Sequence, residues 1–323
     1  MSEFQMPEFQ FIETNGIRLR CVVEGQGPLV ILVHGWPESW YSWRHQIAPL
    51  VAAGYRVCVP DVRGYGGSDK PEPIESYDMV SMTGDIAGLI DALEAEDAIL
   101  VGHDWGAPII YVASILHREK IRAVCGMSIP YTGRPPVPAI RIFKKAFAGK
   151  FFYMIYFQEE GVAEAEFEAD LPRALSTIYR RGSVDAPRDG VFQAKASSVA
   201  FLDGTSPPET LPCWLGEADL AYYVSQFEQS GMRGPINRYR NFERDWKALP
   251  QLADEKITQP SSFISGACDP TLTMFGSADT LAVMKTLTTD FRGERMIEGI
   301  GHWVQQEAPE ETNEALLGFL DSL

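Results

Sequence analysis

The stretch from Val101 to Pro108, V-G-H-D-W-G-A-P, constrains the fold of this chain more than any other. An apolar run at residues 98–101 precedes it, and a second apolar segment at residues 107–113 follows it. The first run is short and rich in aliphatic side chains, as in a buried strand, whereas the second has the composition of a buried helix. We therefore expect a strand, a sharp turn and a helix.

Asp104 occupies the centre of that turn. Gly102 and Gly106 flank it at the G-x-nucleophile-x-G spacing of a nucleophile elbow, in which serine is the commoner nucleophile. Glycine is needed at both positions because the elbow is strained and packs too tightly for a Cβ atom. Asp104 is thus the candidate nucleophile. The alternative, that Asp104 only caps the following helix, would not require the pair of glycines.

Size and composition set the class of protein. A chain of 323 residues with 45% apolar residues can bury the core of one large α/β domain with a smaller insertion. Its N-terminus lacks a basic segment followed by an apolar one, and no apolar run approaches 18 residues, so neither secretion nor membrane spanning is expected. A net charge of −16 disfavours binding to nucleic acid or to anionic membranes.

The five cysteines are widely spaced and form no C-x-x-C motif. This pattern argues against both a disulfide framework and a zinc site. We expect reduced thiols and a cytoplasmic location.

Strands and helices alternate along most of the chain. After a hairpin around Asn15-Gly16, strands are predicted at residues 29–33, 55–59 and 98–101 with helices between them. Further strands follow at 123–129, 262–265 and 294–297, and a helix at 310–320 closes the chain. This order predicts an α/β fold with a doubly wound, mostly parallel sheet. Residues 131–246 are helical, aromatic and rich in loops, and we assign them to an inserted helical cap, with residues 1–130 and 247–323 as the core domain.

A histidine and an orienting acid should accompany Asp104, because the ester formed by a carboxylate nucleophile must be released by an activated water molecule. The usual chain order is nucleophile, acid, histidine. Of the two later histidines, His117 lies in the polar tail of a helix, whereas His302 follows the last strand in G-I-G-H-W. His302 is therefore the candidate base. His34 and His103 are assigned structural roles.

Asp269 is the candidate orienting acid because it follows the strand at residues 262–265. A purely structural role in the turn before Pro270 is the alternative. Some proteins of this architecture place the acid after the strand that precedes the cap, but that strand ends M-S-I-P and offers no carboxylate. Asp279 is kept as a reserve.

Two backbone N–H groups should stabilise the oxyanion formed during ester hydrolysis. The motif places one at Trp105, directly after the nucleophile, and the other at Trp36 in H-G-W-P. A cis peptide bond before Pro37 would turn the Trp36 amide inward, although most X-Pro bonds are trans.

Four stretches resemble those of the soluble α/β-hydrolase-fold epoxide hydrolases: H-G-W-P-E-S, D-V-R-G-Y-G-G-S-D, G-H-D-W-G-A and G-H-W. The resemblance runs from about residue 11 to the end of the chain. It implies the α/β-hydrolase fold with a cap, a small uncharged epoxide and water as reactants, and no cofactor or metal. The sequence leaves the oligomeric state open between a monomer and a homodimer.

The resemblance extends to two cap segments, at residues 151–161 and 234–241, that carry paired tyrosines in that family. By this resemblance, Tyr153 and Tyr239 donate hydrogen bonds to the epoxide oxygen. A phenol suits this task because it stays protonated at neutral pH. Either tyrosine could instead be aromatic lining, and Tyr156, one helical turn away, is the alternative to Tyr153. Glu160 stands where proline is common in the family.

The sequence therefore predicts an epoxide hydrolase, with detoxification, catabolism and biosynthesis as open physiological roles, that forms vicinal diols through an Asp104 ester, which His302-activated water hydrolyses. A haloalkane or haloacid dehalogenase is the nearest alternative, but the cap tyrosines and a tryptophan rather than an asparagine at position 36 disfavour it. A serine esterase is disfavoured because the G-M-S-I-P stretch lacks a second glycine. A non-catalytic receptor of the same fold remains the alternative from outside the enzymes.

Overall fold

The computed structural model describes residues 6–186, 195–273 and 279–323. Residues 1–5, the first part of the N-terminal segment considered above, lie outside this range. Within the described chain, every helix is too short or too polar to cross a bilayer.

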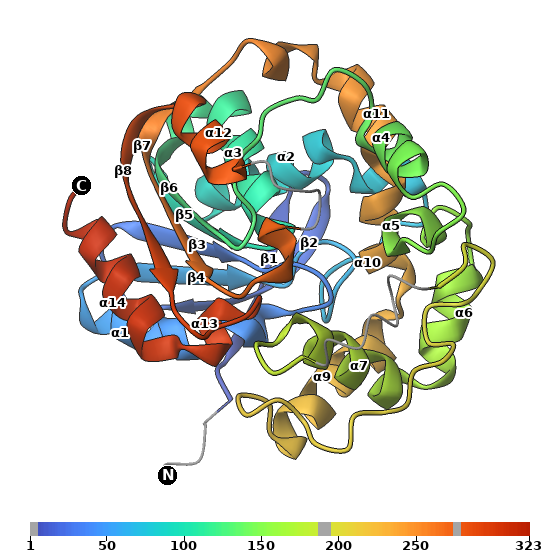
Figure 1. Cartoon of the computed structure of the whole chain (residues 1–323). Coiled ribbons are helices and arrows are strands. Elements are labelled where there is room, and N and C mark those ends of the chain that lie inside the picture. The colour runs from blue at the N-terminus through green and yellow to red at the C-terminus, as the bar shows by residue number, and fades with distance from the viewer. Residues whose placement is uncertain (1–5, 187–194, 274–278) are drawn as a thin grey trace.

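An eight-stranded sheet forms the centre of the molecule (Figure 1), in the order β1-β2-β4-β3-β5-β6-β7-β8. β1 and β2 form the expected antiparallel hairpin, β2 pairs with β4 in antiparallel fashion, and all the later pairs are parallel. The strands are β1 (Phe9–Thr14), β2 (Ile17–Glu24), β3 (Leu29–Val33), β4 (Arg56–Pro60), β5 (Ala98–His103), β6 (Ile121–Met127), β7 (Ile257–Gly266) and β8 (Thr288–Ile297).

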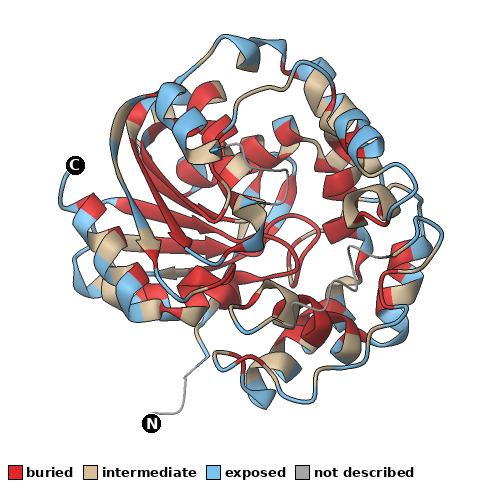
Figure 2. Ribbon diagram, in the orientation of Figure 1, coloured by how far each residue is buried: buried red, intermediate tan, exposed pale blue. Residues whose placement is uncertain are grey.

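Helices cover both faces of the sheet. Every residue of β3 and β5 is buried, as expected for aliphatic strands packed on both sides (Figure 2). Helices α2 and α3 pack on one face, and α1 and α14 lie together on the other. The core helices are α1 (Arg44–Ala52), α2 (Met79–Ala92), α3 (Gly106–Leu116), α12 (Thr280–Thr286), α13 (Val304–Glu307) and α14 (Pro309–Leu320). The predicted doubly wound sheet is thereby confirmed.

β8 is longer than the sequence suggested. The pattern predicted a strand only at residues 294–297, whereas β8 begins at Thr288. The additional residues are mostly polar and partly exposed, since β8 is an edge strand, and they therefore lack the apolar run that marks a central strand.

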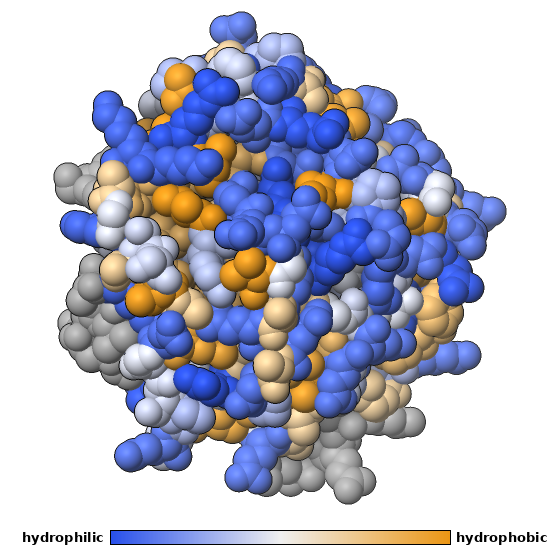
Figure 3. Space-filling view, turned by 90° about the vertical axis from the view of Figure 1, so that its right-hand side faces the viewer, coloured by the Kyte–Doolittle hydropathy of each residue, from blue (hydrophilic) through white to orange (hydrophobic). Residues whose placement is uncertain are grey.

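An inserted set of helices lies between β6 and β7 and stands beside one end of the sheet (Figure 1). These helices confirm the predicted cap, while its exact boundaries at residues 131 and 246 stay a prediction. Figure 3 shows the side of the molecule that lies at the right in Figure 1. Hydrophilic residues cover most of this face, and its hydrophobic residues lie in separate patches. The cap helices are α4 (Ala139–Ala146), α5 (Tyr153–Tyr156), α6 (Val162–Ala169), α7 (Leu171–Gly182), α9 (Glu217–Ser230), α10 (Arg233–Asn237) and α11 (Phe242–Ala248).

The register of the parallel strands determines which loops meet. Gly102 of β5 lies opposite Val33 of β3 and Gly126 of β6, and Gly266 of β7 lies opposite Ile297 of β8. The carboxyl ends of these strands therefore share one edge of the sheet, where chains of this class carry their sites. The cap stands over the same edge.

Candidate active site

The turn between β5 and α3 has the geometry of a nucleophile elbow. Asp104 has a φ of 50°, a left-handed conformation that is costly for a residue with a side chain. A Cβ atom on Gly102 would overlap the carbonyl oxygen of Gly106, and one on Gly106 would overlap that of Val33. Glycine is thus required at both flanking positions, for the reason that the sequence predicted.

The carboxylate of Asp104 faces the loop that follows β3. The backbone N–H of Trp36 donates a hydrogen bond to Asp104 Oδ1 at 2.8 Å, and the Trp36–Pro37 peptide bond is cis. Trp105 directly precedes α3, beside the nucleophile. The structure thus places both predicted N–H donors next to Asp104, and their role toward an oxyanion stays a prediction.

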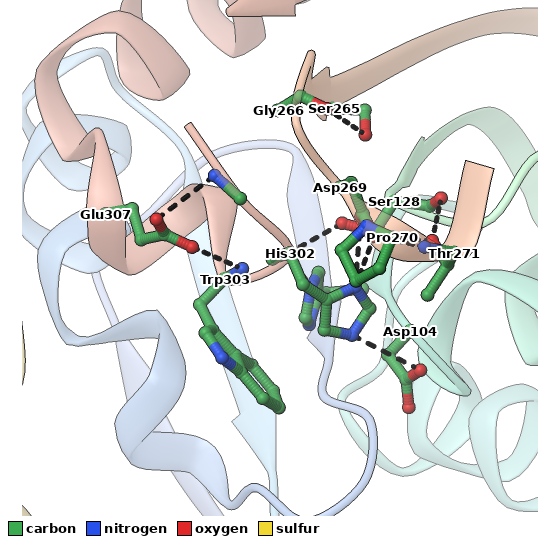
Figure 4. Close-up of polar contacts among 12 residues, drawn as sticks. Asp104, Ser128, Ser265, Gly266, Asp269, Pro270, Thr271, His302, Trp303 and Glu307 are labelled. Carbon is green, nitrogen blue, oxygen red and sulfur yellow. Dashed lines mark hydrogen bonds and ion pairs between the residues drawn. The ribbon is translucent and has the colours of Figure 1, made fainter. Parts of the chain in front are cut away.

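His302 lies between two carboxylates (Figure 4). Its Nε2 is 3.5 Å from Asp104 Oδ2, and its Nδ1 is 3.0 Å from Asp269 Oδ2. Three loops, after β5, β7 and β8, therefore bring these side chains together. Asp279 is exposed and caps α12 by accepting from the N–H of Ala282, so the reserve acid lies elsewhere.

The three ionisable groups shift one another's pKa. Burial alone lowers the pKa of His302, but the charges and hydrogen bonds of Asp269 and Asp104 outweigh it and hold the pKa well above its ordinary value. Burial raises the pKa of each aspartate, yet the contacts with His302 lower it below the usual range. The site therefore favours a protonated imidazole between two ionised carboxylates.

Hydroxyl groups that the sequence did not reveal hold this arrangement in place. Asp269 Oδ1 accepts hydrogen bonds from the backbone N–H of Thr271 at 2.8 Å and from its hydroxyl at 2.7 Å. The hydroxyl of Ser128, directly after β6, donates to the backbone carbonyl of His302 at 2.8 Å. In the sequence, only the position of Ser128 directly after a strand could have indicated this contact.

A cavity of about 800 Å³ opens above the nucleophile. Asp104, His302 and both predicted cap tyrosines, Tyr153 and Tyr239, contribute to its lining. The Tyr153 ring stacks over Trp36 at 6.2 Å between ring centroids, and the Tyr239 ring meets Tyr153 edge-on at 5.9 Å. Burial raises the pKa of both phenols, and the nearby charge of Asp104 adds to this shift, so each keeps its proton.

Tyr156, the alternative to Tyr153, does not line this cavity. Its hydroxyl donates to Glu166 Oε2 at 2.8 Å, whereas it is the Tyr153 ring that stacks on Trp36. The sequence alone could not separate these two tyrosines.

A buried carboxylate that the sequence analysis did not single out joins several parts of the site. Glu38 Oε2 accepts from the N–H of Gly35, next to Trp36, and lies 2.8 Å from His103 Nδ1. Gln305 donates to the other oxygen of Glu38 at 3.0 Å. His34, as expected, has a structural role, because its Nε2 accepts from the N–H of Val62.

Comparisons with known proteins agree with this geometry. Residues 28–309 match the family model of the alpha/beta hydrolase fold. The chain is 43% identical over 322 residues to epoxide hydrolase A of Mycobacterium tuberculosis, and the match covers 98% of each chain. The crystal structure of epoxide hydrolase A from Mycobacterium thermoresistibile matches with a TM-score of 0.90 and 41% identity, covering 98% of each chain. An epoxide hydrolase from an endophytic Streptomyces matches with a TM-score of 0.92 and 40% identity, covering 97% of this chain and 95% of that one.

The chain belongs to the α/β-hydrolase-fold epoxide hydrolases. It is an enzyme, a hydrolase that acts on epoxides. Within the part of this epoxide hydrolase that the structure describes, no group of three or more His, Cys, Asp or Glu side chains is arranged to hold a metal ion. The polar groups that line its cavity include the carboxylate of Asp104, the imidazole of His302 and the phenols of Tyr153 and Tyr239, and the side chains of Lys150 and Arg181 also contribute to the lining.

Proposed function

We propose that this epoxide hydrolase opens its substrate by covalent catalysis at Asp104. A carboxylate oxygen of Asp104 attacks an epoxide carbon, an ester C–O bond forms, and the C–O bond of the three-membered ring breaks. Tyr153 and Tyr239 donate hydrogen bonds to the departing oxygen, and one of them gives it a proton. An unshifted phenol has a pKa of about 10 and is already a neutral donor at pH 7, and burial strengthens this property.

Hydrolysis of the ester completes the cycle. His302, oriented by Asp269, takes a proton from water, and the resulting hydroxide attacks the carbonyl carbon of the Asp104 ester. The N–H groups of Trp36 and Trp105 stabilise the oxyanion. When the intermediate collapses, His302 returns the proton to the departing oxygen of the diol. The second proton of the water, released as the Asp104 carboxylate re-forms, restores the tyrosine.

The observation that carries this proposal is that one cavity holds all the groups required. Asp104, His302 and both tyrosines face the same space, and Asp269 lies directly behind His302. The remaining lining is largely aromatic and aliphatic, which suits an uncharged epoxide.

A single turnover in heavy-oxygen water tests the ester route. Label should enter the Asp104 carboxylate in the first turnover and reach the diol only in later ones, because water attacks the ester carbonyl and not the substrate carbon. Label in the diol after the first turnover would contradict the proposal. With His302→Gln, intact-mass measurement should reveal an enzyme heavier by one substrate molecule.

The dehalogenase alternative predicts a different product. Release of chloride or bromide from short haloalkanes, with no diol formed from styrene oxide, would favour it. A receptor would bind such epoxides without converting them.

We also propose a cytoplasmic location. All five cysteines are free thiols, of which Cys21, Cys58 and Cys125 are buried in the core. Reduced thiols are typical of the cytoplasm. A monomer or a homodimer is the proposed state in solution.

A further inference from the structure

The carboxylate of Glu307 binds three backbone N–H groups at once. Its Oε2 accepts from Gly301 at 3.1 Å and from Val184 at 3.2 Å. Its Oε1 accepts from Trp303 at 3.0 Å (Figure 4). Gly301 and Trp303 are the two neighbours of His302 in the chain. Val184 belongs to the cap, just after α7. One side chain therefore joins the cap to the loop at residues 298–303 between β8 and α13, which we call the histidine loop.

Further contacts hold the same two segments together. The N–H of His302 donates to the carbonyl of Gly182 at 2.7 Å, and the indole N–H of Trp303 donates to the carbonyl of Tyr179 at 2.8 Å. A Cβ atom on Gly301 would lie 2.6 Å from Gly182 O and 2.6 Å from Val184 N. The end of α7 and the histidine loop are thus in direct backbone contact.

The other end of the His302 backbone is fixed to the core. Its carbonyl accepts from His103 Nε2 and from the Ser128 hydroxyl, each at 2.8 Å. The position of the imidazole consequently depends on core contacts at the carbonyl and on cap contacts at the N–H. In the contacts between this loop and the cap, Glu307 offers a carboxylate, whereas Gly182 and Tyr179 offer neutral carbonyl groups. Hydrogen bonds to a carboxylate are stronger than those between neutral groups.

We propose that Glu307 is a positioning residue that fastens the histidine loop to the cap and thereby sets His302 for hydrolysis of the ester. This inference rests on the proposed function, since it concerns the second of its two steps. Asp104 has its own support in Trp36 and the elbow. Ester formation therefore depends on Glu307 less than ester hydrolysis does.

The test compares the rates of ester formation and ester hydrolysis in Glu307→Gln. This change keeps the size of the side chain but replaces one acceptor oxygen by an NH2 group, which cannot accept from the backbone N–H that faces it. Rapid quenching and intact-mass measurement give the rates at which the ester appears and disappears. We expect ester decay to slow about tenfold and ester formation to change less than about threefold. The ester should therefore accumulate at steady state.

Glu168→Gln is the matched control, because Glu168 also accepts a backbone N–H in the cap, from Met232, without contacting the histidine loop. In Glu168→Gln, the ratio of the rate of ester decay to the rate of ester formation should equal that of the unaltered enzyme. Glu307→Asp retains the carboxylate and should restore decay part of the way. If Glu307→Gln does not fold, Glu307→Asp alone is compared with the control, and slower decay without slower formation is again expected.

Unchanged decay, or an equal slowing of both steps, would overturn the role of Glu307. Such a result differs from a failure of the proposed function, in which the unaltered enzyme itself would form no ester. A change in unfolding temperature without a change in the ratio of the two rates would also count against the proposal, because it would indicate a purely structural role.

Discussion

His103 donates a hydrogen bond through Nε2 to the backbone carbonyl of His302, 2.8 Å away. Its other ring nitrogen lies 2.8 Å from a carboxylate oxygen of Glu38, and both side chains are fully buried. The buried ring of His103 is therefore held at both of its nitrogens, by a backbone carbonyl on one side and a carboxyl group on the other. Glu38 and His103 thus form a buried, hydrogen-bonded pair directly behind His302.

Replacement of Glu38 by glutamine should therefore destabilise the fold. The change replaces a buried carboxylate oxygen by an amide group, which disturbs the contacts of Glu38 with Gly35 and His103, and we expect the free energy of unfolding to fall by about 3 kcal/mol. Urea unfolding followed by circular dichroism measures this. Glu119→Gln, at an exposed position, is the control and should change stability by less than about 0.5 kcal/mol. A loss for Glu38→Gln no larger than that of the control would contradict the stabilising role of these contacts.

The two tyrosines of α5 should differ sharply in their effect on catalysis. Tyr153→Phe removes a donor that faces the cavity, and we expect ester formation to slow about a hundredfold. Tyr156→Phe removes a hydroxyl bound to Glu166, so formation should stay within about threefold of the original rate. Single-turnover measurements with an epoxide distinguish the two. Equal losses would mean that the cap adopts another arrangement during catalysis.

Features that depend on a local pattern could be predicted from the sequence. The elbow around Asp104 was predictable because the two glycines that its packing requires stand at a fixed spacing within five residues of the chain. His302 and Asp269 were placed correctly beside it because each follows a strand whose carboxyl end meets the same edge of the sheet. Their catalytic roles stay predictions.

Features that depend on distant partners could not be predicted. Glu38 stands in a loop like many other glutamates, and its partner His103 is 65 positions away. Nothing local distinguishes Tyr153 from Tyr156, since the distinction depends on which ring lies over Trp36 and which hydroxyl meets Glu166. The roles of Ser128 and Glu307 likewise arise only when the loops meet.

Hydrolysis of the ester should become faster as the pH rises. In the proposed mechanism His302 must lose its proton to act as a base, and its pKa in the free enzyme is held well above the ordinary value by Asp269 and Asp104. Esterification removes the charge of Asp104, so the pKa of His302 should fall in the intermediate. The midpoint of the decay rate against pH should thus lie below the midpoint of His302 titration in the free enzyme, which NMR measures. Coincident midpoints would contradict this coupling.

The same shift makes stability depend on pH. The pKa of His302 in the folded protein lies above the ordinary value of 6.5, so its contribution to stability is present in full below about pH 6.5 and is lost as the pH rises through the folded pKa. The difference in the free energy of unfolding between the unaltered enzyme and His302→Gln should therefore shrink as the pH rises. Urea unfolding at several pH values checks this. A difference that grows with pH would reverse the assigned direction of the shift.

Two glycine replacements should change stability in opposite directions. In Gly106→Ala the new methyl group would overlap the carbonyl oxygen of Val33, a backbone atom in the centre of the sheet. Because neither β3 nor the elbow can move without disturbing the core, we expect a loss of about 3 kcal/mol or more, or no soluble protein.

Gly318 lies within α14, where an added Cβ atom meets nothing within 4 Å. Gly318→Ala should therefore raise the free energy of unfolding by up to about 1 kcal/mol, since alanine favours the helix and restricts the unfolded chain. Urea unfolding of Gly106→Ala and Gly318→Ala gives the change in the free energy of unfolding for each. The comparison separates the steric need for glycine at the elbow from the general effect of replacing glycine by alanine. If Gly106→Ala were tolerated as well as Gly318→Ala, the elbow would not have the tight packing on which the placement of Asp104 depends.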